Sequence, residues 1–162
     1  EFRPPIAQSS SAYLRAASRL MSASVLFFRV LLLASVACGI IGSFIDGVFP
    51  SLIPKTLADA FEALPPPPAI ALFGASVLFL ITFGGSVTAV VGLYLFQPWS
   101  RPLALCMTAL GLLFHPLLGP VVESGWSRFF LEVSSLLWGA VLAMSFVSSL
   151  SARFVEGPRA DF

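Results

Sequence analysis

The chain has 162 residues, of which 57% are hydrophobic and 10% are charged, and its mean hydropathy is +0.94. Soluble domains carry roughly 25% charged residues, so this composition excludes an ordinary water-soluble protein. The net charge of +1, without any cluster of lysine or arginine, excludes nucleic acid as a partner. We expect the lipid bilayer to be the solvent of an all-α, polytopic membrane protein.

Residues 1–24 precede the first long apolar run and form the expected cytoplasmic or interfacial segment. Arg15 and Arg19 fall on one helical face of residues 11–21, and apolar side chains fall on the other. This pattern predicts a short amphipathic helix on a membrane surface, with a disordered leader as the alternative. The apolar face consists of Tyr13, Leu14, Ala17, Leu20 and Met21.

The first span is predicted over residues 25–49. Its uncharged part, between Arg29 and Asp46, is about 24 Å of helix, so both charges should lie in opposite boundary zones of a roughly 30 Å hydrocarbon core. A cleaved signal peptide is the alternative, but hydrophobicity continues to Phe49, and we expect the span to be retained. A stripe of small residues at four-residue spacing predicts its packing face: Ser35, Gly39, Ser43 and Gly47.

The loop that follows should contain a short helix, and a stiff proline strut should lead to the second span. Thr56 and Asp59 fit a capping box at the start of the short helix. The second span is predicted over residues 69–96, about 42 Å of helix, so it must tilt or bend, and Gly84-Gly85 is the candidate joint. Gly84, Thr88 and Gly92 form a second stripe for helix packing.

Two further spans complete a predicted four-helix transmembrane domain over residues 25–151. The turn Gln97-Pro98-Trp99-Ser100-Arg101-Pro102 leads into a span over residues 102–119, and the last span covers residues 126–151. Ser135, Gly139 and Ala143 form the third packing stripe. Residues 152–162 are expected to be a cytoplasmic tail.

The distribution of basic residues predicts the topology. With four spans, seven of them share one side and two lie on the other, which places both termini in the cytoplasm. The seven are Arg3, Arg15, Arg19, Arg29, Arg101, Arg153 and Arg159, and the two are Lys55 and Arg128.

Three ionisable side chains enter apolar segments from the outer side: Asp46, His115 and Glu132. Ionisable groups at that depth usually face the interior or a wet cavity, so they are a candidate proton or cation site. In the structural alternative, Glu132 pairs with Arg128, and Asp46 lies where its helix ends at the headgroups. His115 then caps a helix that is broken at the next proline. This set of groups is a poor ligand set for a transition metal, and we expect no metal site.

No motif for catalysis or a cofactor is present. A single histidine excludes bis-histidine haem ligation, and no Gly-rich phosphate loop or nucleophile elbow occurs. Cys38 and Cys106 are not paired as CxxC, and we expect both to be small buried core residues. The chain is therefore expected not to be an enzyme and to carry no cofactor.

The hairpin Gly92–Leu105 and the segment Trp138–Met144 resemble small uncharacterised four-span proteins of bacterial inner membranes. The resemblance implies a location in a bacterial inner membrane and four membrane spans, and no binding residue can be transferred from it.

Two functions follow from these features. The first is a non-catalytic integral membrane protein, a helical subunit or partner-binding component of a larger membrane assembly, whose partners are other membrane subunits or further copies of itself. The alternative is a small oligomeric transporter or channel with a proton or cation site at Glu132 and His115.

Overall fold

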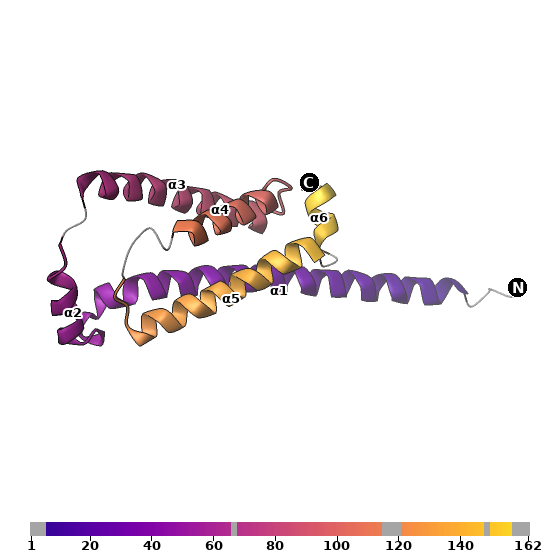
Figure 1. Cartoon of the computed structure of the whole chain (residues 1–162). Coiled ribbons are helices and arrows are strands. Elements are labelled where there is room, and N and C mark those ends of the chain that lie inside the picture. Colours follow the sequence, from indigo (N-terminus) through magenta and orange to yellow (C-terminus); the bar gives the residue numbers. More distant parts are fainter. Residues whose placement is uncertain (1–5, 66–67, 115–120, 148–149, 157–162) are drawn as a thin grey trace, which may run out of the picture.

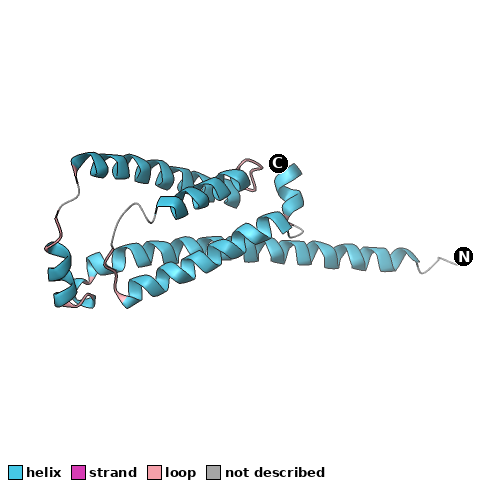
Figure 2. Ribbon diagram, in the orientation of Figure 1, coloured by secondary structure: helices cyan, strands magenta, loops and turns pink. Residues whose placement is uncertain are grey.

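The computed structural model describes residues 6–65, 68–114, 121–147 and 150–156, and within them all regular structure is helical (Figure 2). Three helices contain stretches long and apolar enough to cross a membrane, Ala23–Val48, Leu72–Tyr94 and Gly125–Val147, and Ser100–Leu113 is apolar but shorter. The chain is therefore a helical protein with several candidate membrane-spanning helices. Its elements are α1 (Ile6–Val48), the 3-10 turn η1 (Pro50–Leu52), α2 (Lys55–Glu62), α3 (Ala69–Tyr94), α4 (Ser100–Phe114), α5 (Gly125–Val147) and α6 (Ser151–Glu156).

Helix α1 is longer than the sequence predicts. It runs unbroken for 43 residues, about 65 Å, where we expected a short amphipathic helix followed by a separate span. No glycine or proline lies between Ile6 and Cys38, so nothing in the backbone interrupts the helix. As a result, the N-terminal half of α1 projects beyond the other helices (Figure 1).

Helix α2 also begins differently from the prediction. Its N-cap is Pro54, and no side chain caps its first turn, so the expected capping box of Thr56 and Asp59 does not form. Proline already has the backbone angle that a helix needs, with φ of −58° here, and it allows Lys55 to start the helix.

The helices form two antiparallel pairs that lie in two layers (Figure 1). Helix α5 runs along α1, and α4 folds back along α3. At one end, η1 and α2 connect the layers, and at the other end the short helix α6 crosses near the α3–α4 turn. Each pair is closely packed, whereas the two layers touch each other much less.

The contact between α1 and α5 follows steps of four and three residues. On α1 it includes Phe28, Leu32, Ser35, Gly39 and Gly42, which face Ser127, Leu131, Ser134 and Val141 of α5. Such spacing is typical of helices that cross at a shallow angle, as in coiled coils.

Small side chains bring the two helices close enough for serine hydroxyls to donate hydrogen bonds to the backbone of the other helix. The Ser35 hydroxyl donates to the carbonyl of Ser134 at 3.0 Å, and the Ser134 hydroxyl donates to the carbonyl of Ser35 at 2.8 Å. Further along, the Ser127 hydroxyl donates to the carbonyl of Gly42 at 2.8 Å. These three hydroxyls are thus satisfied without water.

Two glycines also allow α3 and α4 to pack closely against each other. A Cβ atom at Gly85 would meet the sulfur of Met107, and one at Gly92 would lie 2.6 Å from Cβ of Ser100. Between them, Ala89 and Ala104 are fully buried. The turn is closed by Phe96, which has a φ of 56°, and by the Gln97 N–H, which donates to the carbonyl of Gly92 at 2.8 Å.

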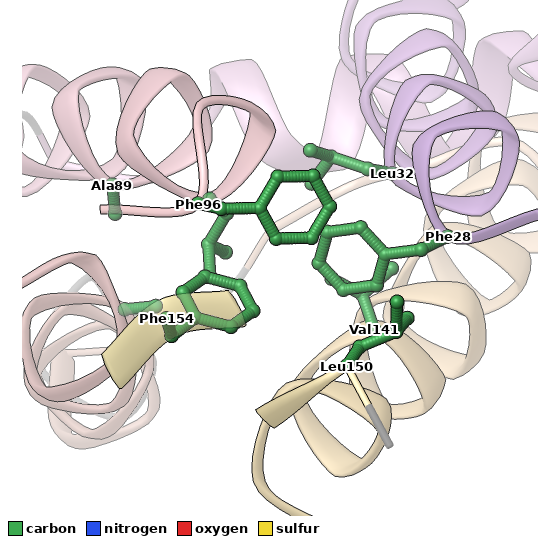
Figure 3. Close-up of a cluster of buried hydrophobic side chains, with 9 residues drawn as sticks. Phe28, Leu32, Ala89, Phe96, Val141, Leu150 and Phe154 are labelled. Carbon is green, nitrogen blue, oxygen red and sulfur yellow. The ribbon is translucent and has the colours of Figure 1, made fainter. Parts of the chain in front are cut away.

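A buried aromatic cluster joins the two layers at the α6 end (Figure 3). Phe28 of α1, Phe96 of the turn and Phe154 of α6 have ring centroids 5.1 to 6.1 Å apart. Leu32, Leu93, Val141 and Leu150 complete its apolar surroundings. Because these residues come from both layers, this cluster connects them.

Candidate functional site

Asp46 is a structural link between helices. Its Oδ2 accepts a hydrogen bond from the backbone N–H of Ser124 at 2.8 Å. Ser124 is the N-cap of α5, since its hydroxyl accepts from the N–H of Ser127 and its carbonyl from the N–H of Arg128. The other carboxylate oxygen, Oδ1, is buried without a hydrogen-bond partner among the described residues. Asp46 therefore fixes the C-terminal end of α1 to the start of α5.

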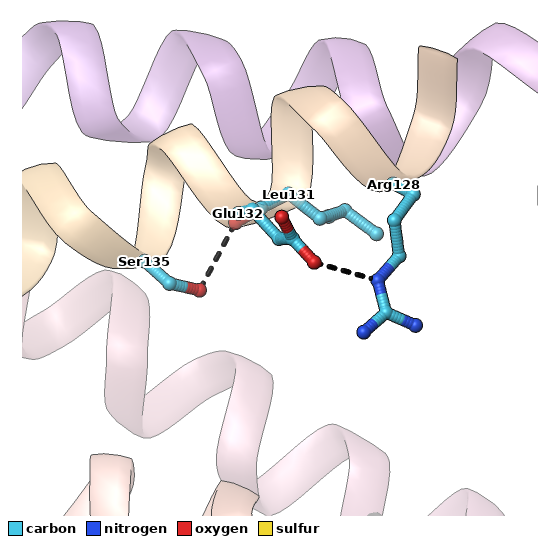
Figure 4. A network of polar contacts seen from close by, with 4 residues as sticks. All are labelled: Arg128, Leu131, Glu132 and Ser135. Atoms are coloured by element: carbon cyan, nitrogen blue, oxygen red, sulfur yellow. Dashed lines mark hydrogen bonds and ion pairs between the residues drawn. The ribbon is translucent and has the colours of Figure 1, made fainter. Parts of the chain in front are cut away.

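Glu132 lies on the exposed side of α5 and pairs with Arg128 (Figure 4). The Arg128 Nε donates to Glu132 Oε1 at 2.8 Å, and the two side chains are 71% and 64% exposed. This is the surface pair, one helical turn apart, that was the structural alternative for Glu132.

His115 lies outside the described residues, so the structure does not place it relative to Glu132 or Asp46. Among the residues that are described, no group of three histidine, cysteine or acidic side chains is close enough to hold a metal ion. The proton or cation site at His115 and Glu132 stays a prediction.

The structure brings three residues of the predicted stripes into helix contacts. Ser35 and Gly39 face Ser134, and Gly92 faces Trp99 and Ser100. The remaining seven are exposed: Ser43, Gly47, Gly84, Thr88, Ser135, Gly139 and Ala143. The predicted burial of the cysteines was wrong, since Cys38 is only half-buried and Cys106 is exposed.

Two arginines enclose the aromatic cluster at the α6 end. The guanidinium carbon of Arg29 lies 4.6 Å from the ring centroid of Tyr94, and that of Arg101 lies 4.6 Å from the ring centroid of Phe154. Arg101 also donates to the carbonyl of Ser151 at 2.9 Å. Stacking on aromatic faces offsets part of the cost of placing these charges beside an apolar cluster, although the Nε of Arg29 is buried without a hydrogen-bond partner among the described residues. The aromatic cluster and these two arginines therefore close the space between the layers at the α6 end.

Next to the cluster, a cavity of about 570 Å³ separates the two layers. Val90 and Trp138 belong both to its wall and to the surroundings of the aromatic cluster. Its wall is mainly apolar, and all four long helices contribute: α1 with Ser35, Val36 and Gly39; α3 with Ala75, Leu78, Phe79, Thr82, Ser86 and Val90; α4 with Met107, Thr108, Gly111 and Leu112; α5 with Ser134, Ser135 and Trp138.

Most polar groups of the cavity wall are already paired. The Trp138 indole N–H donates to the hydroxyl of Thr108 at 2.8 Å, and that hydroxyl donates to the carbonyl of Ala104. Thr82 is different, because its hydroxyl oxygen is buried and has no hydrogen-bond partner among the described residues. The wall therefore offers apolar contact along most of its length, with little to bind a charged ligand.

Sequence reasoning missed this cavity as a site. Its wall comes from positions that look unremarkable one by one, and only the separation of the layers brings them together. The one available signal was the pair Thr82 and Ser86, hydroxyls one turn apart in an apolar run. Comparison with models of protein families, with characterised proteins and with solved structures found no match.

Proposed function

We propose that this chain is a multi-pass membrane protein of non-catalytic type that serves as a helical subunit, or partner-binding component, of a larger membrane assembly. The observation that carries the proposal is the exposed stripe of Ser135, Gly139 and Ala143 on α5. Helix α5 uses a different face to pack on α1. Ser135 borders the space between the layers, whereas Gly139 and Ala143 lie outside its wall and remain open for a helix of another subunit or of a second copy.

The stripe is suited to close helix approach within a bilayer. No heavy atom beyond the helix itself lies within 4 Å of the position that a Cβ atom at Gly139 would take. In hydrocarbon, helices associate through dispersion contacts and interhelical hydrogen bonds, and both need backbones that come close together. The Ser135 hydroxyl donates to the carbonyl of Leu131 at 3.0 Å, so it costs little to bury against a neighbour (Figure 4).

We further propose four membrane crossings, with α4 as the fourth, and both termini in the cytoplasm of a bacterial inner membrane. The resemblance of the α3–α4 hairpin to small four-span inner-membrane proteins supports this location. The placement of Arg29 and Arg101 at the same end supports the orientation, because basic residues are enriched on the cytoplasmic side.

Purification of the full chain in a mild detergent tests the proposed assembly. We expect a complex larger than one chain, containing companion polypeptides or several copies, and we expect Gly139→Leu to reduce its yield because the added side chain separates the helices. Gly74→Leu is the matched control, since Gly74 is also exposed with open space around it but lies outside the three stripes. A well-folded single chain without companions would remove the proposal.

A further inference from the structure

The cavity between the layers is long and narrow. The α3 residues in its wall run from Ala75 to Val90, which is about 22 Å of helix. Dividing the volume of about 570 Å³ by this length gives a mean cross-section of about 26 Å². The shape therefore favours an elongated occupant over a compact one.

This cross-section distinguishes a hydrocarbon chain from a helix. Carbon atoms of neighbouring chains are in contact at about 4.0–4.5 Å, so one extended hydrocarbon chain needs a cross-section of about 16–20 Å². A helix is at least about 10 Å wide and needs about 80 Å². The cavity is wide enough for a single chain and narrower than a helix with its side chains.

The position of the cavity favours the same occupant. Its wall is formed by middle parts of α1 and α5, by most of the candidate span of α3 and by the C-terminal half of the apolar helix α4, at depths where a bilayer contains hydrocarbon. An empty space of this kind would lose the dispersion contacts that neighbouring atoms supply. The few hydroxyls in the wall are mostly paired, which suits an alkyl chain better than a polar ligand.

We propose that this cavity binds one acyl chain of a bilayer lipid. The aromatic cluster closes the α6 end, so the chain enters with its methyl end toward Val90 and Trp138 and its polar end toward Ala75 and Leu112. A phospholipid and a free fatty acid supply the same acyl chemistry. Apart from Ser135, which belongs to both surfaces, this binding does not involve the stripe on α5, so it is independent of whether Gly139 and Ala143 meet another subunit.

Trp138 provides a direct measurement, because it lies in the cavity wall. In the full chain carrying Trp99→Phe and Trp126→Phe, it is the one remaining tryptophan. We expect its fluorescence to be quenched in phosphatidylglycerol vesicles whose acyl chains carry bromine near the methyl end. Brominated stearic acid added to unbrominated vesicles forms the second arm, and quenching there identifies a free fatty acid as a competent source.

Filling the cavity separates bound lipid from lipid that only touches the outer surface. Gly111 lines the cavity with no atom within 4 Å of an added Cβ, so Gly111→Leu should fit and remove most of the quenching. Ala75→Leu is a second filling variant, for use if the first does not fold. Gly84→Leu is the control, because Gly84 is exposed, has equally open space and does not line the cavity.

Mass spectrometry of the protein after transfer into detergent gives a second readout. We expect one retained lipid per chain in the parent and in the control variant. The filling variants should lose this lipid. Unquenched Trp138 in both arms, or equal quenching in folded parent and filling variants, would overturn the proposal.

Discussion

At the scale of single residues, polar side chains in this apolar chain mostly serve helix geometry. Asp46 satisfies a backbone N–H at the start of α5, and the hydroxyls of Ser35, Ser127 and Ser134 are satisfied by donating to carbonyls across the α1–α5 seam. An unsatisfied polar group costs several kcal/mol in hydrocarbon, so each such contact has a clear structural value. A functional role for a polar residue has to be weighed against this role in satisfying hydrogen bonds between helices.

Replacement of Asp46 tests that interpretation. We expect Asp46→Ala to lower the free energy of unfolding by about 1–2 kcal/mol, because the N–H of Ser124 loses a charge-assisted partner at a helix start. The measurement is thermal or denaturant unfolding in detergent. Asp59→Ala is the control, since Asp59 is exposed on α2 and should have little effect. Equal stability of the two variants would show that the link between α1 and α5 contributes nothing.

At the scale of helices, their positions were predicted better than their contacts. The second span was expected over residues 69–96 and the helix covers Ala69–Tyr94, because a proline run before it and a turn after it bound the apolar run. The packing face of α1 was predicted from a four-residue spacing that ends at Ser43 and Gly47. The structure uses Gly42 instead, since two long antiparallel helices stay in contact only when steps of four and three alternate.

The cavity and the aromatic cluster could not be predicted from the sequence, for a related reason. Helix periodicity shows which residues share a face, but it does not show which helix lies opposite that face. Phe28, Phe96 and Phe154 are widely separated in the sequence, and nothing local indicates that their rings meet. The continuity of α1 was predictable, because no helix-breaking residue separates its two parts.

The two glycines near the end of α1 distinguish the two packing registers. At Gly42, an added Cβ would lie 2.9 Å from Cγ of Leu131 and 3.1 Å from its backbone nitrogen, whereas at Gly47 it would meet nothing within 4 Å. We expect Gly42→Ala to lower the free energy of unfolding by about 1 kcal/mol, since overpacking outweighs the gain in helix propensity. Gly47→Ala should be neutral or slightly stabilising. Unfolding in detergent measures both, and the reverse order would favour the four-residue register.

At the scale of the whole molecule, charge divides the two ends. Arg29 and Arg101 lie beside the aromatic cluster at the α6 end, whereas Asp46 lies near the C-terminal end of α1 and the Arg128–Glu132 pair lies in the first turns of α5. The two antiparallel pairs bring the α3–α4 turn and α6 to one end and η1 and the start of α5 to the other. An even number of crossings follows if all four long helices span the bilayer.

Accessibility of single cysteines tests this topology. In a chain with Cys38 and Cys106 replaced by alanine, we expect a membrane-impermeant maleimide to label Ser51→Cys and Val121→Cys in intact bacteria. It should label Ala152→Cys only after the membrane is opened, because basic residues retain that end in the cytoplasm. All three positions are exposed in the structure, so labelling reports the side of the membrane rather than burial. Labelling of Ser51→Cys and Val121→Cys from opposite sides would mean that α4 turns back within the bilayer, since α4 alone, at 15 residues and about 22 Å, is shorter than the hydrocarbon core.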